Sequence, residues 1–167
     1  MAATKTKPKA QRAKQATGAK VKANGITPFL WFDGNAEEAA RFYVSLFQGS
    51  RIQSASPMSV AFTVAGQGVI ALNGGPAYKL TPAFSMFVEV NTQEEVDTLW
   101  EKLTEGGAES RCGWLVDRFG LSWQVIPKRL PQLLYHKDPG VAQRAMEAML
   151  KMRKIDIAEL NAAAKGR

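Results

Sequence analysis

The sequence predicts an α+β domain made of two similar halves, each with the order strand–helix–strand–strand. The first observation is a repeat: "EEAARFYVSLFQG" begins at Glu37, and "EEVDTLWEKLTEG" begins 57 positions later at Glu94. The second is a strand-like run before each copy, and the third is a pair of strand-like runs after each copy. Because neither half could close a hydrophobic core alone, we expect the two to pack with pseudo-twofold symmetry.

Both repeated segments are predicted to be amphipathic helices. Apolar residues recur at spacings of three and four, as in Ala39, Phe42 and Leu46 of the first copy, and so share one face. Each copy begins with two glutamates, which the helix dipole favours in the first turn. Gly49 and Gly106 are placed to end the helices.

The strands are predicted from short apolar and aromatic runs between turn residues. The six runs are 26–32, 58–64, 68–73, 84–90, 112–116 and 121–126. A further short strand is expected near Arg51–Ser54 or Ala108–Arg111. Each half then becomes a βαβββ module, the first over residues 25–75 and the second over residues 80–127, within a paired unit that spans 25–127.

Residues 128–167 depart from the repeat and are predicted to form a helical extension. Asp138-Pro139 is typical of a helix start, and an apolar stripe that includes Met146 and Leu150 follows. Asp156 is placed to cap a last short helix. We expect these helices to pack on the outside of the sheet or across a dimer interface.

The net charge of +7 belongs to residues 1–24, which hold seven basic residues between Lys5 and Lys22 and no acid. Removing 7 from 22 basic residues leaves 15 against 15 acidic residues, so the rest of the chain is neutral. This Lys/Ala-rich tail is predicted to be disordered, as a solvated arm. A weak, salt-dependent contact of Lys5–Lys22 with nucleic acid or another polyanion is the alternative. A transit peptide fits less well, because the tail has one Arg and no apolar stripe.

Cysteine and histidine each occur once, as Cys112 and His136. One cysteine excludes an intramolecular disulfide, and one histidine is too few for the two or three His ligands of most catalytic zinc or iron sites. No apolar run approaches the roughly 20 residues that span a bilayer, and the chain does not open with a signal peptide. The sequence therefore predicts a cytoplasmic protein with no membrane partner.

Four segments, in this order, resemble a known family: "FDGNAEEAARFY", "ALNGGPAYKLTPAFSMFVEVNTQEEVDTLW", "CGWLVDRFGLSWQVIP" and "AMLKMRKIDIAEL". With the doubled module, they are similar to the PhnB-like branch of the vicinal oxygen chelate (VOC) superfamily, which includes glyoxalase I, extradiol dioxygenases and bleomycin-resistance proteins. The resemblance covers about residues 25–165. It implies that the modules curve into a cupped mixed sheet and that two copies form a homodimer. Many members of the branch carry the label of a demethylubiquinone methyltransferase.

In the metal-dependent members, ligands lie on the first and last strands of each module. The resemblance places Pro28 and Ser85 at the first-strand positions, and Gln124 with either Asn73 or Leu72 at the last-strand positions. Proline and leucine side chains have no ligand atom, and neutral amides and hydroxyls are poor ligands for a transition metal. We therefore predict that the protein has neither a bound metal nor another cofactor.

A ligand site is predicted around Gln124, a polar residue within an apolar strand. An unpaired buried amide would cost about 1–3 kcal/mol, so this side chain needs partners. Either it bonds the neighbouring backbone, or it orients a ligand together with Asn73 and Ser85, and both interpretations stay open. The aromatic side chains expected around such a ligand are Trp31, Phe87, Trp114 and Trp123.

The predicted function is metal-free binding of a small apolar or aromatic molecule, and a metal-independent enzyme of the same superfamily is the alternative. Methyl transfer is disfavoured, because the strand, glycine-rich loop and helix of a nucleotide-like cofactor site are not found in the sequence. Cys112, Asp117, Glu89 and His136 are candidates for acid–base chemistry. None has sequence neighbours that assign it a catalytic role.

Overall fold

Two four-stranded mixed sheets form the centre of the protein, in a computed structural model that describes residues 20–166. The first sheet has the order β1-β4-β3-β2, with β1 parallel to β4 and the other neighbours antiparallel. The second has the matching order β5-β8-β7-β6 and the same directions. The strands are β1 Phe29–Phe32, β2 Arg51–Ala55, β3 Ser59–Val64, β4 Gln67–Asn73, β5 Ser85–Val90, β6 Ala108–Glu109, β7 Trp114–Val116 and β8 Ser122–Pro127. The predicted pair of βαβββ modules is therefore confirmed, including the short strands β2 and β6.

One helix covers one face of each sheet. α1 (Ala36–Leu46) packs on the first sheet, and α2 (Gln93–Thr104) packs on the second. The buried residues of α2 recur at the predicted spacing, as Val96, Leu99, Trp100 and Leu103. A capping box begins this helix: Thr92 Oγ1 accepts a hydrogen bond from Glu95 N, and the Glu95 carboxylate accepts one from Thr92 N. The local sequence thus fixes where α2 starts and which face it buries.

Strand β7 is shorter than the sequence predicts. It begins at Trp114 and not at Cys112, because Cys112 and Gly113 have positive φ angles of 58° and 82°. Their backbone N–H groups donate to Met152 O and Arg153 O of the C-terminal extension. The extension therefore redirects the chain at a point where sequence pattern alone predicts a continuous strand.

The C-terminal extension forms three helices, α3 (Arg129–Leu134), α4 (Pro139–Met149) and α5 (Ile157–Ala164). Asp138 caps α4 by accepting from Gly140 N, and Asp156 caps α5 by accepting from Glu159 N, as predicted. A separate apolar cluster holds the three helices against the end of β8; its buried members are Ile126, Leu130, Leu133, Ala145, Ala148, Met152, Ile155, Leu160 and Ala164. The helix α3 was not predicted.

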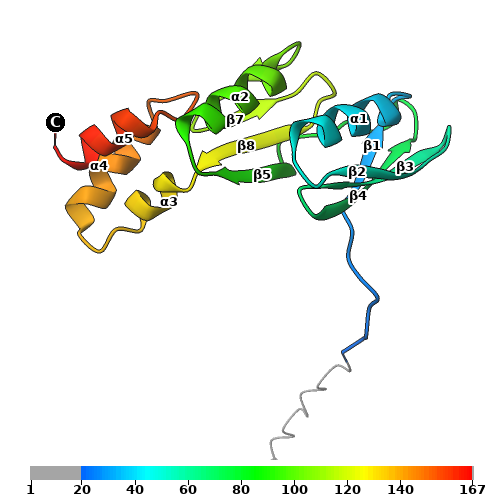
Figure 1. Ribbon diagram of the computed structural model, residues 1–167, viewed down its shortest axis with the longest axis horizontal. Helices are drawn as coiled ribbons and strands as arrows, with labels where there is room; N and C mark the ends of the chain where they lie inside the picture. The colour runs from blue at the N-terminus through cyan, green and yellow to red at the C-terminus, as the bar shows by residue number, and fades with distance from the viewer. Residues whose placement is uncertain (1–19, 167) are drawn as a thin grey trace, which may run out of the picture.

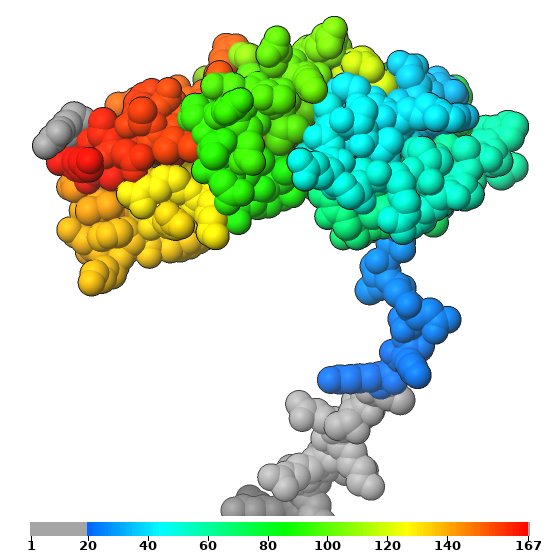
Figure 2. Space-filling view, in the orientation of Figure 1, coloured from blue at the N-terminus to red at the C-terminus, as the bar shows by residue number. Residues whose placement is uncertain are grey.

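The parts of the chain follow one another along the long axis of the molecule. Figure 1 shows α3–α5 at one end, the second module in the middle and the first module at the other end, with α1 and α2 over the same side of the sheets. The space-filling view shows the same succession of blocks (Figure 2). One buried cluster contains residues of both modules, including Leu30 and Phe62 of the first and Leu115 and Trp123 of the second. The other face of each sheet carries no helix from the described part of the chain (Figure 1).

The predicted basic tail lies almost entirely outside the described residues. Of residues 1–24, only Lys20–Asn24 are described, and all five are exposed. Within residues 20–166, no helix is both long enough and apolar enough to cross a membrane.

Candidate functional site

Gln124 is the centre of a mixed polar and aromatic surface on the second sheet. Its neighbours across the ladder are Phe87 on β5 and Trp114 on β7. Residues paired in this way point to the same face of a sheet, which here is the face opposite α2. Gln124 Nε2 donates a hydrogen bond of 2.9 Å to Ser85 Oγ. Four of the predicted ligand-site residues therefore lie together.

Ser122 belongs to the same surface and was not predicted. It lies two positions before Gln124 on β8, so its side chain points to the same face, and it pairs with Ser85 across the ladder. Its hydroxyl is buried, with the residue 1% exposed, and has no hydrogen-bond partner among the described residues. The alternation of β8 was the sequence signal that could have found it.

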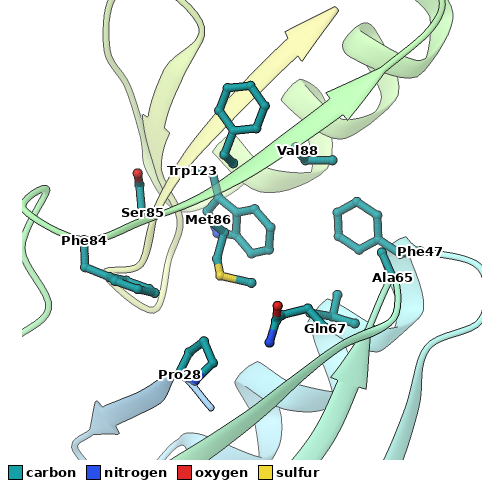
Figure 3. Close-up of a pocket in the computed structure, with 11 residues that line it drawn as sticks. Pro28, Phe47, Ala65, Gln67, Phe84, Ser85, Met86, Val88 and Trp123 are labelled. Carbon is teal, nitrogen blue, oxygen red and sulfur yellow. The ribbon is translucent and has the colours of Figure 1, made fainter. Parts of the chain in front are cut away.

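A cavity of about 350 Å³ lies between the two modules, along the edge of β5. The side chains of Pro28 and Gln67 approach it from the first module, and Phe84 and Met86 approach it from the second (Figure 3). Its complete lining is Pro28, Phe47, Val64, Ala65, Gln67, Phe84, Ser85, Met86, Phe87, Val88 and Trp123. Ser85, Phe87 and Trp123 were predicted for the ligand site. The sequence did not indicate that Phe47 or Gln67 would lie opposite them.

Trp123 lines this cavity from the helix-covered face of the sheet. It is 1% exposed and packs against Tyr43 and Phe47 of the first module, with ring centroids 5.3 and 6.0 Å away. Its indole Nε1 donates a hydrogen bond of 2.8 Å to Asp117 Oδ2. Trp123 is therefore a fixed wall and lies on the side of the sheet opposite to Gln124.

Asp117 holds the turn behind this wall. Its Oδ1 accepts hydrogen bonds from Phe119 N at 2.9 Å and Leu121 N at 3.0 Å. Burial raises the pKa of Asp117, although these N–H donors oppose the rise. Burial and the nearby Asp117 carboxylate raise the pKa of the Tyr43 hydroxyl. Asp117 thus has a structural position at the contact between modules.

Asn73 does not join Gln124 and Ser85. It lies in the first sheet, where its Oδ1 accepts from Ala36 N at 2.8 Å and its Nδ2 donates to Pro57 O at 2.9 Å. Asn35, the residue at the start of α1, makes no side-chain cap, so Asn73 supplies the cap from a neighbouring strand. Because strand residues alternate, Leu72 and not Asn73 faces away from the helix.

Trp31 is also separate from the cavity. Its Nε1 donates a hydrogen bond of 2.8 Å to Gly75 O, and its ring makes an edge contact with Tyr78 at 5.0 Å. A Cβ atom built on Gly74 would meet the Trp31 ring, so the linker after β4 lies directly on the indole. Trp31 lines a different and smaller hollow of about 230 Å³, together with Tyr78 and Phe119.

The positions that the superfamily uses for metal do not fit a dication in this chain. Pro28 and Leu72 have no side-chain donor, and Asn73 already caps α1. Ser85 and Gln124 are neutral and bond each other. Nowhere in residues 20–166 do three or more His, Cys, Asp or Glu residues gather as a metal-binding group would require.

The four residues considered for acid–base chemistry are dispersed, and none is among the residues that line the cavity. Cys112 is half-buried at the strained turn before β7. The Nδ1 atom of His136 accepts from Asp138 N in a loop, and Glu89 is exposed on β5. Asp117 is buried behind Trp123. Among the described residues, none of these four makes a hydrogen bond or an ion pair with another of the four.

Residues 24–126 match the sequence profile of a family described as 3-demethylubiquinone-9 3-methyltransferase. A PhnB protein from Bacillus cereus is 36% identical, with a TM-score of 0.57, over 61% of this chain and 98% of that one. Protein PA1353 from Pseudomonas aeruginosa is 25% identical, with a TM-score of 0.52, over 63% of this chain and 98% of that one. No protein of curated function matches. The profile covers more than half of the chain and the two modules have one topology, so the chain belongs to this PhnB-like family of the VOC fold.

Proposed function

We propose that the protein binds a small, largely apolar or aromatic molecule, without a metal, in the cavity along β5. The observation that carries the proposal is the cavity itself: about 350 Å³, walled by Phe47, Phe84, Met86 and Trp123. Ligand pockets in proteins span about 300–1,000 Å³, are mainly apolar and contain a few polar groups. This cavity is at the small end of that range, which suits a molecule of one or two rings.

The walls of the cavity are held in place before any ligand arrives. Trp123 is fixed by Asp117 on one side and by Phe47 stacked on the other, with the two rings 17° from parallel. Ser85 is fixed by Gln124. Ligand binding would therefore cost little free energy for ordering these side chains, as is expected of a preformed site.

A thermal-shift screen tests the proposal. A hundredfold excess of ligand over its Kd should stabilise the protein by about 2.7 kcal/mol, or roughly 5–10 °C for a chain of this size. Gln67→Trp should abolish the shift, because Gln67 is an exposed residue at the cavity wall and the larger ring would fill the space. Gln143→Trp is the matched control on the exposed surface of α4 and should keep the shift. An apolar library that never moves the melting temperature would contradict the proposal.

Methyl transfer is the competing function, because the description of the family names a methyltransferase. The glycines after β4 do not form a cofactor loop: Gly74 packs on Trp31, and the chain continues as a linker to β5. The turn between β1 and α1 contains one glycine, Gly34. Incubation with methyl-labelled S-adenosylmethionine and a demethylubiquinone analogue would detect this activity, and turnover above the blank would replace the binding proposal.

A homodimer is the proposed assembly. Phe29 on β1 and Phe87 on β5 are each 58% exposed on the sheet faces that carry no described helix. A second copy that covers these faces would bury both rings and complete the cup that the family resemblance implies. Sedimentation should give a dimer for the wild type and a monomer for Phe29→Glu. A wild type that sediments as a monomer at high concentration would contradict this assembly.

The basic tail is proposed to make only weak, salt-dependent contact with polyanions. Lys5–Lys22 carries the net charge of the whole chain, and the described members of this segment, Lys20 and Lys22, are exposed. Deletion of residues 1–24 should remove retention on DNA at low salt and leave ligand-induced stabilisation unchanged. Equal retention of the truncated protein would assign the contact to the domain.

A further inference from the structure

We infer that the ligand carries an amide-like pair, an N–H and a C=O on adjacent atoms of a neutral ring, and that the backbone of Phe87 binds this pair. This inference deepens the proposed function and rests on it. It follows from the edge of β5, where the main chain faces the cavity between the modules.

Strand β5 is the outer strand of its sheet, with β8 on one side and no described strand on the other. The cavity is lined by four consecutive residues of this strand, Ser85–Val88. Side chains of consecutive residues point to opposite faces, so a hollow that contacts all four lies against the strand edge and not against either face. The ligand therefore meets the main chain of β5.

The direction of the backbone groups can be derived from one hydrogen bond. Lys128 N donates to Val90 O at 2.8 Å, so the carbonyl of Val90 points toward β8. The N–H and C=O of one residue point to the same side of a strand, and the side alternates along the chain. The backbone groups of Val88 therefore also point toward β8, and those of Phe87 point away from it. Phe87 presents its N–H and its C=O to the cavity.

A donor and an acceptor side by side on a strand edge are the groups that a further strand would use. A small ring can use them in the same way if it carries a lactam or imide, whose C=O accepts from Phe87 N–H while its N–H donates to Phe87 C=O. A strand itself fits less well, because Pro28, Ala65 and Gln67 of the first module form the opposite wall. The cavity thus selects a short amide-like group.

The ligand is expected to be neutral as well as small. The described residues that line the cavity include no charged side chain, and Gln67 is the polar side chain of the first-module wall. The Gln67 carboxamide donates from Nε2 to Gly68 O at 2.8 Å, which leaves its oxygen directed into the cavity (Figure 3). Burying an ion against apolar walls without a partner would be strongly unfavourable.

Three probes of similar shape separate this inference from the proposed function. Oxindole carries the lactam pair, N-methyloxindole lacks the N–H, and indane is apolar throughout. We expect oxindole to bind the wild type at least about fivefold more tightly than either of the others, since one hydrogen bond of ordinary strength changes affinity by about two- to tenfold. Equal affinities would overturn the inference and leave the proposed function standing. No binding of any of the three probes would also overturn the inference, and the thermal-shift screen of the apolar library then decides the proposed function separately.

Proline at position 87 tests which backbone group is used. Phe87→Pro removes an N–H that points away from the ladder, so this edge strand should keep its pairing with β8. It should lose the preference for oxindole, while Phe87→Ala, which keeps the N–H, should retain it. Val88→Pro removes an N–H that points toward β8 and should lower stability more than Phe87→Pro does. The opposite order of stabilities would show that the groups are assigned to the wrong side.

Discussion

Asp117→Ala should destabilise the protein by about 3 kcal/mol, because three hydrogen-bond donors share the carboxylate that this substitution removes. Trp123 Nε1 donates to the carboxylate at 2.8 Å, Phe119 N at 2.9 Å and Leu121 N at 3.0 Å. Alanine leaves each of these groups without its acceptor. The Asp117 carboxylate then no longer joins the turn between β7 and β8 to the Trp123 indole at the wall of the cavity.

The magnitude follows from the burial of each donor. An unsatisfied buried donor costs about 1–3 kcal/mol, and Trp123, which is 1% exposed, should bear this cost in full. Phe119 lies at a half-buried turn, so its N–H can gain a bond to water. Removal of Asp117 also relieves the desolvation that raises the pKa of its carboxyl. The free energy of unfolding is therefore expected to fall by about 2–4 kcal/mol, which is less than the summed cost of three fully buried donors without acceptors.

Urea unfolding measures the loss, provided that the slope with denaturant is unchanged. Asp138→Ala is the matched control: this aspartate is exposed and caps α4 by accepting from Gly140 N at 2.8 Å. Loss of such a cap costs about 1 kcal/mol. If Asp117→Ala costs no more than Asp138→Ala, the buried carboxylate does not hold the turn and the indole as described.

Three further predictions concern stability. Folding raises the pKa of Asp117 above the unfolded value of about 3.9, so the buried charge of Asp117 reduces stability above the folded pKa. The wild type should therefore gain stability relative to Asp117→Asn as the pH is lowered from 7 toward 4. A stability difference between the two proteins that changes in the other direction would contradict the shift. Asn73→Ala should cost about 1–2 kcal/mol in urea unfolding and leave probe affinity unchanged, whereas weaker binding at unchanged stability would place Asn73 in the ligand site. Gly74→Ala should cost about 1–3 kcal/mol, because its Cβ would meet the Trp31 ring, while Gly25→Ala, with open space around it, should be neutral; equal melting temperatures for the two would be inconsistent with the close packing.

The architecture could be predicted because its signals are local. The apolar spacing of each repeated helix, the glutamates of its first turn and the aspartates at positions 138 and 156 all act within a few residues of the chain. The sequence of elements along each module, strand–helix–strand–strand, was predicted from the duplication. The short helix α3 was missed because "RLPQLL" has a proline inside it and carries no capping signal.

The sequence could predict only part of the arrangement of the candidate site, for a physical reason. Gln124, Ser85, Phe87 and Trp114 share one face because strand alternation and pairing place them there. Asn73 was assigned from the family resemblance, with Leu72 as the alternative, yet the first module uses Asn73 to cap α1. The cavity depends on how the two modules pack, and this long-range contact brings Phe47 and Gln67 to β5 without any local pattern.

Methyl NMR of Met86 tests the central claim most directly. Met86 lines the cavity, whereas Met58 and Met146 are exposed elsewhere, 69% and 42% respectively. Protein with labelled methionine methyl groups, dialysed against EDTA, should show a shift of the Met86 signal as oxindole is added and none at Met58 or Met146. A Met86 signal that stays fixed up to saturating oxindole, or that moves only after a metal is restored, would contradict a metal-free binding cavity between the modules.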